Sequence, residues 1–78
     1  MLFRSPANTA TLVAGGVKQL TITNTSTTAT LYLGEYGVTN TLYGIALSPG
    51  ASVHVGDLPA NFYGYATSAV VASILYIL

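Results

Sequence analysis

The sequence predicts a single all-β domain over residues 1–78, built as an antiparallel sandwich or small barrel of about seven short strands. Three observations favour this fold class. Apolar and polar residues alternate with a period of two at residues 20–23, 30–33 and 52–55, which is the pattern of half-buried strands. Val, Ile, Thr and Tyr are frequent, and these residue types favour a pleated, half-covered surface. Turn signals containing Gly or Pro divide the chain at regular, short intervals.

The turns have recognisable chemistry. Gly15-Gly16 predicts a tight hairpin between the first two strands, because primed turns need positive φ angles. Ser48-Pro49-Gly50-Ala51 has Pro and Gly at its two central positions, which fits a type II turn. An extended arm is one interpretation of residues 1–8. The expected strands are residues 9–14, 17–24, 29–34, 43–48, 51–56, 62–66 and 69–77.

The last expected strand, residues 69–77, is apolar on both of its faces. One face can fill the core, but the other must be covered as well, since an uncovered strand of this kind promotes aggregation. Two interpretations stay open: the strand is central beneath a second layer, or it lies in a subunit interface.

Charge is almost absent from the chain, which carries two Lys or Arg, two Asp or Glu and no Cys. Soluble domains are roughly a quarter charged. Two cations cannot neutralise several phosphates, so we expect no nucleic-acid binding. The longest apolar stretch, about ten residues, is too short for a membrane helix, and the first six residues lack the pattern of a signal peptide. A small domain without disulfides or metal usually relies on oligomerisation, so we expect a homo-oligomer, with a trimer as the first guess.

Catalytic and modification sites have weak support. His54 with Asp57 could belong to a serine triad, but Val53-His54-Val55 turns the imidazole away from the core face, and triads depend on geometry. Glu35 with Asp57 could act as paired carboxylates, although a domain this small has little room for a cleft. Asn24-Thr25-Ser26 matches the N-glycosylation pattern. We expect a chain that is not an enzyme, with no catalytic residue, metal or cofactor.

The six tyrosines are the candidate contact residues, since an apolar ring with a polar tip suits interfaces. Tyr32 points away from the face of Leu31 and Leu33, and Tyr36 lies in a loop. Tyr63 and Tyr65 share one strand face. The predicted interface residues are Tyr32, Tyr36, Ile74 and Tyr76.

A series of motifs over residues 17–77 resembles small β-sandwich structural proteins of tailed-phage virions. The resemblance rests on turn and strand motifs. The sequence departs from it in two places, at Glu35-Tyr36 and in the apolar last strand. The motifs are Leu-Thr-Ile-Thr-Asn-Thr-Ser at 20–26, Leu-Tyr-Leu-Gly at 31–34, Gly-Ile-Ala-Leu-Ser-Pro-Gly-Ala-Ser-Val at 44–53, Asp-Leu-Pro at 57–59 and Tyr-Gly-Tyr-Ala at 63–66.

The resemblance implies a virion structural protein, made in the host cytoplasm. The favoured function is a capsid decoration or cement subunit that binds the major capsid protein or other virion proteins. The alternatives are a receptor- or glycan-binding module of a fibre or tail, in which Tyr36 could stack on a sugar, and another head, neck, tail or sheath subunit.

Overall fold

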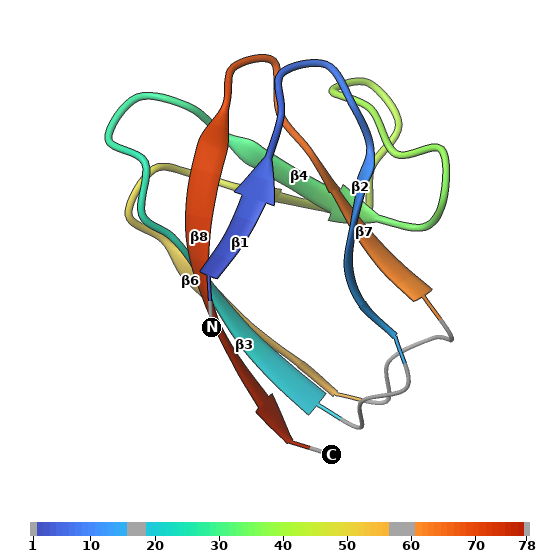
Figure 1. The fold of residues 1–78 in the computed structure, drawn as a ribbon, viewed down its shortest axis with the longest axis vertical. Helices are drawn as coiled ribbons and strands as arrows, with labels where there is room; N and C mark the ends of the chain where they lie inside the picture. The colour runs from blue at the N-terminus through green and yellow to red at the C-terminus, as the bar shows by residue number, and fades with distance from the viewer. Residues whose placement is uncertain (1, 16–18, 57–60, 78) are drawn as a thin grey trace.

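The computed structural model describes residues 2–15, 19–56 and 61–77, and it confirms an all-β fold of the sandwich type. These residues form eight strands and no helix, and Figure 1 shows how the strands are arranged. The strands are β1 (Leu2–Ser5), β2 (Thr11–Gly15), β3 (Gln19–Asn24), β4 (Leu31–Gly34), β5 (Ile45–Leu47), β6 (Ser52–Gly56), β7 (Asn61–Tyr65) and β8 (Val70–Ile77).

The strands form two four-stranded sheets with the orders β1-β8-β3-β6 and β2-β7-β4-β5, and every strand pair is antiparallel. The pairing is nested along the chain: β1 pairs with β8, β2 with β7, β3 with β6 and β4 with β5. This order is that of an eight-stranded jelly roll. Except between β4 and β5, each step along the chain crosses from one sheet to the other.

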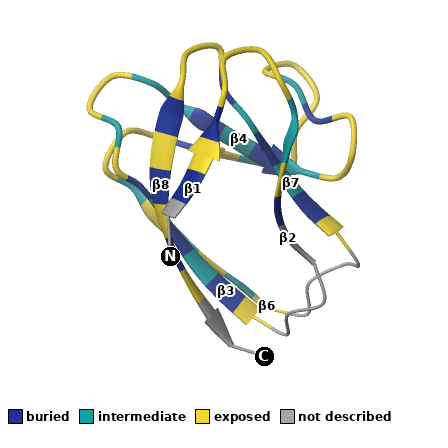
Figure 2. Ribbon diagram, viewed as in Figure 1, coloured by how far each residue is buried: buried dark blue, intermediate teal, exposed yellow. Residues whose placement is uncertain are grey.

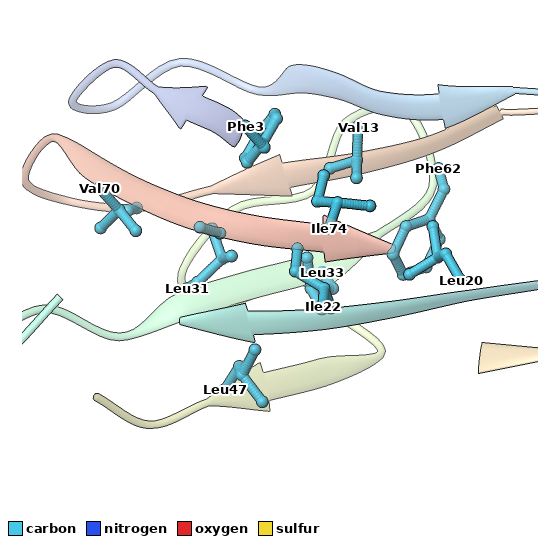
Figure 3. Packing of buried hydrophobic residues seen from close by; sticks show 12 residues of the cluster. Phe3, Val13, Leu20, Ile22, Leu31, Leu33, Leu47, Phe62, Val70 and Ile74 are labelled. Carbon is cyan, nitrogen blue, oxygen red and sulfur yellow. The ribbon is translucent and has the colours of Figure 1, made fainter. Parts of the chain in front are cut away.

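The core lies between the two sheets and is filled by the inward residues of each strand, as Figure 3 shows. Gly64 on β7 leaves room for the ring of Phe3 from the opposite sheet, because an added Cβ would lie 3.0 Å from two atoms of that ring. The buried cluster is Phe3, Val13, Leu20, Ile22, Leu31, Leu33, Leu47, Phe62, Ala66, Val70, Ala72 and Ile74.

Two local predictions differ from the structure. Residues 2–5, expected as part of an arm, form β1, because Phe3 and Ser5 point into the core and the backbone pairs with β8. The hairpin predicted at Gly15-Gly16 is wrong: β2 pairs with β7, whereas β3 pairs with β6 and β8 in the other sheet. The sequence also favours a loop at residues 57–61, because Pro59 cannot donate to a central ladder; residues 57–60 lie outside the described residues.

The type II turn at residues 48–51 is confirmed and connects the two sheets. The amide of Ala51 donates to the carbonyl of Ser48 at 3.0 Å, and Gly50 has a φ of 77°. Asn24, at the end of β3, is completely buried beside this turn. Its Nδ2 donates to the carbonyl oxygens of Ala29 and Leu47, at 2.8 and 3.0 Å, so one side chain joins both sheets.

The last strand, β8, is central in its sheet, between β1 and β3. Its inward residues include Ile74, which is only 4% exposed. Its outward residues Val71 and Leu75 are exposed, Leu75 by 68%, and Figure 2 shows this alternation along the strand. The strand is therefore central in its sheet, but no layer within the described part of the chain covers its outer face. The first interpretation holds only in part, and the interpretation as a subunit interface stays a prediction.

Candidate tyrosine contact face

Tyrosines gather on the outer face of the β2-β7-β4-β5 sheet. Tyr32 on β4 and Tyr63 and Tyr65 on β7 point outward, because their strand neighbours, such as Leu33 and Phe62, point into the core. Tyr32 lies directly opposite Tyr65 in the ladder between the two strands. Residues opposite one another across strands lie about 5 Å apart, so these rings form one continuous surface.

The loop between β4 and β5 extends this surface. Tyr36 is 84% exposed, and its ring contacts that of Tyr63 with centroids 5.5 Å apart. The ring of Tyr43 contacts that of Tyr32 with centroids 5.0 Å apart. Leu12 on β2 lies opposite Tyr63 and is also exposed. We define the tyrosine face as Leu12, Tyr32, Tyr36, Tyr43, Tyr63 and Tyr65, which includes five of the six tyrosines.

The first half of this loop is a defined turn. The amide of Val38 donates to the carbonyl of Glu35, and Gly37 has a φ of 93°, a conformation that favours glycine. Val38 is buried and packs towards Gly34, where an added Cβ would lie 3.3 Å from Val38 Cγ2. Tyr36 is thereby presented at the tip of an anchored turn.

The second half of the loop is held by Thr39. Its Oγ1 accepts from the amides of Thr41 and Leu42, at 3.2 and 3.1 Å, and its own amide donates to the carbonyl of Leu42. Leu42 and Tyr43 follow as exposed side chains.

An open pocket of about 360 Å³ lies within this loop. Glu35 is the only charged residue in its lining. The lining residues are Gly34, Glu35, Tyr36, Gly37, Val38, Leu42, Tyr43 and Gly44.

The outer face of the β1-β8-β3-β6 sheet has a different character. Thr21 Oγ1 and His54 Nδ1 form a hydrogen bond of 3.0 Å, and Thr23 and Ser52 hydroxyls form one of 2.7 Å. His54 is thus exposed beside a threonine, as expected for a residue on the polar face. Asp57, the proposed acid partner of both His54 and Glu35, lies outside the described residues.

Of the four predicted interface residues, two lie on the tyrosine face and one lies in the core. Tyr32 and Tyr36 lie on the tyrosine face, where they contact Tyr43 and Tyr63. Ile74 requires a correction: it fills the core, opposite Ile22 in the ladder of β8 with β3, and offers almost no surface to a partner. The side chain of Tyr76 lies outside what the structure describes.

Tyr43, Tyr63 and Tyr65 join Tyr32 and Tyr36 on this face, which the sequence did not predict. The alternation of residues along β7 indicates that Tyr63 and Tyr65 point outward. It does not indicate that β7 lies beside β4, because that pairing joins residues far apart in the sequence. The glycosylation pattern at Asn24 is a separate case. The side chain of Asn24 is completely buried and its Nδ2 donates to two carbonyl groups, so the folded chain offers no free amide for modification.

Within the described ranges, no three His, Asp or Glu side chains gather as metal ligands would. None of the described residues forms a helix long and apolar enough to cross a membrane. Comparison of the chain with family models, with curated proteins and with solved structures gives no match.

Proposed function

We propose that this chain is a structural subunit of a tailed-phage virion, most directly a capsid decoration subunit, that binds its partner through the tyrosine face. One observation carries the proposal: five of six tyrosines lie on one outer face of a domain that has almost no charge. Interface centres are enriched in aromatic residues and depleted in charged ones. The resemblance of residues 17–77 to phage structural modules points in the same direction.

The mechanism would be passive. A rigid sandwich bridges neighbouring subunits of the shell and adds contact area, with tyrosine rings covering apolar surface and phenol groups forming hydrogen bonds. Many copies on one particle gain from multivalency, so modest single contacts suffice. With four charged residues in the whole chain, salt would weaken the contact little.

The outer face of β8 supplies a second contact surface in this account. Val71 and Leu75 are exposed there on a central strand, with Leu75 opposite Thr21 of β3 and Val71 opposite Arg4 of β1. We infer that copies of the chain associate through this face, which would leave the tyrosine face on the opposite sheet free for the shell. A trimer is the simplest assembly to test.

A glycan-binding module of a fibre or tail is the second candidate. The observation that favours it is the exposed ring of Tyr36 beside the pocket, since aromatic rings can stack on sugars. Jelly rolls occur in both capsid and lectin domains, so the topology is an analogy that accommodates both candidates. A glycan array probed with the isolated protein separates them.

The position of the protein in purified particles tests the proposal. Cryo-electron microscopy of particles produced with and without the chain should show added density in a regular lattice on the outside of the shell. Density at a unique vertex or along the tail would select another virion role. Particles that contain no copy of the chain would overturn the virion assignment.

A further inference from the structure

We propose that the pocket in the loop between β4 and β5 binds one cationic side chain, a guanidinium or an ammonium group, of the partner protein. This inference rests on the proposed function, because it specifies what the tyrosine face recognises. It combines three features of the pocket: a carboxylate that pairs with no described residue, two supported aromatic rings and a lining with few side-chain donors.

The carboxylate belongs to Glu35. Among the described residues, this side chain makes no hydrogen bond and no ion pair, and it is the only charged group in the pocket lining. The one described cation, Arg4, points outward from β1 in the opposite sheet. Glu35 therefore pairs with no cation among the described residues.

The rings belong to Tyr36 and Tyr43, and each is supported by a tyrosine on a strand. Tyr36 contacts Tyr63 with an interplanar angle of 77°, and Tyr43 contacts Tyr32 with an angle of 50°. These contacts hold two loop rings in place before any ligand arrives, which lowers the ordering cost of binding. The face of a tyrosine ring attracts a cation.

The remaining lining argues against a sugar. A saccharide presents hydroxyl groups that need both donors and acceptors, and the hydroxyls of Tyr36 and Tyr43 are the only side-chain donors in this lining. Here the other lining residues are glycines and the apolar Val38 and Leu42. A guanidinium has donors only, so a carboxylate and phenol oxygens satisfy it. The volume of about 360 Å³ lies at the low end of the range for small-molecule pockets, roughly 300–1,000 Å³, and is large enough for a guanidinium group.

A nuclear magnetic resonance titration tests the proposal without any particle. The probe is N-acetyl-arginine methylamide, and its matched control is the citrulline analogue, which has the same shape without the charge. We expect the arginine probe to shift the amide signals of Gly34, Gly37 and Gly44, with weak affinity near 1 mM. The citrulline probe should bind about two- to fivefold more weakly, as expected for the loss of one exposed charge pair.

Variants of the pocket provide the second arm. Glu35→Gln keeps the shape, removes the charge, and should lower the affinity for the arginine probe about fivefold. Tyr36→Leu should lower it as well, whereas Tyr36→Phe, which keeps the ring face, should retain most of it.

Two results would overturn the inference: equal binding of the arginine and citrulline probes, or shifts of the same amides by methyl glucoside but not by arginine. If the probes fail while tyrosine-face variants still lose particle binding, only the pocket assignment falls. If arginine binds selectively but particles lack the chain, the virion assignment falls and the pocket chemistry stands.

Discussion

The ring of Tyr36, at the tip of the loop after β4, packs against the ring of Tyr63 on β7, with centroids 5.5 Å apart and planes inclined by 77°. This edge contact connects the most exposed large hydrophobic side chain of the described residues to the sheet. It explains how an 84% exposed tyrosine can belong to an ordered binding surface. The contribution of this ring contact to the free energy of unfolding can be measured.

A double-mutant cycle should detect coupling between these two rings. Tyr36→Leu and Tyr63→Leu each remove one ring, and the pair should show an interaction of about 0.5–1.5 kcal/mol in the free energy of unfolding. Urea denaturation of the four proteins measures it. Tyr36→Leu combined with His54→Ala, on the opposite sheet, should be additive within about 0.5 kcal/mol. Additivity in both cycles would mean that the loop ring is not held by β7.

Asn24→Ala should destabilise the domain by about 2–3 kcal/mol, because the carbonyl groups of Ala29 and Leu47 lose their donor. That is a large part of the roughly 3–5 kcal/mol available to a core of this size. Thr27→Ala, at an exposed position in the same loop, should change the free energy of unfolding by no more than about 0.5 kcal/mol. Equal effects of the two substitutions in thermal or urea unfolding would show that the link between the sheets contributes little.

Ser5→Ala should stabilise the protein. The hydroxyl of Ser5 is buried and has no hydrogen-bond partner among the described residues, so removing it relieves a desolvation cost of about 1 kcal/mol. The midpoint of urea unfolding should rise with an unchanged slope. A clear loss of stability would indicate that the hydroxyl has a partner, such as a buried water.

Ile74→Asp and Leu75→Asp should separate folding from self-association. Aspartate at 74 buries a charge in the core at a cost of several kcal/mol, so this variant should not fold. Leu75→Asp places the charge on the exposed face of β8 and should fold with a native circular dichroism spectrum. In sedimentation at micromolar concentration, wild type should form a small oligomer and Leu75→Asp a monomer. A wild-type monomer would remove the self-association role of β8.

The fold class and the orientation of individual side chains could be predicted from strand periodicity. Tyr32 does point away from Leu31 and Leu33, and Tyr63 and Tyr65 do share a face. The orientation of β8 could not be predicted, because residues on both of its faces are apolar. The pairing of Ile74 with Ile22 decides which face is core.

Long-range pairing accounts for the other differences. Gly15, at the end of β2, and Gly16 favour a local hairpin in the sequence, yet Val13 of β2 and Ile22 of β3 belong to opposite sheets and enter the same core. A four-residue stretch such as Leu2–Ser5 has too little pattern of its own, and it becomes a strand through β8. The pocket beside Glu35 depends on the same pairing, because Gly44 meets Leu33 only when β4 and β5 lie side by side.

The most direct test of the central claim is the binding of face-specific variants to particles that lack the chain. Tyr36→Ala alters an exposed loop residue on the tyrosine face, and His54→Ala alters an exposed residue on the opposite sheet. We expect Tyr36→Ala to lower particle affinity tenfold or more, since truncating a hot-spot residue costs about 2 kcal/mol or more. His54→Ala should bind as wild type does, and wild-type affinity should fall less than tenfold between low salt and about 0.5 M salt. Normal binding of Tyr36→Ala together with loss of binding by His54→Ala would contradict the account.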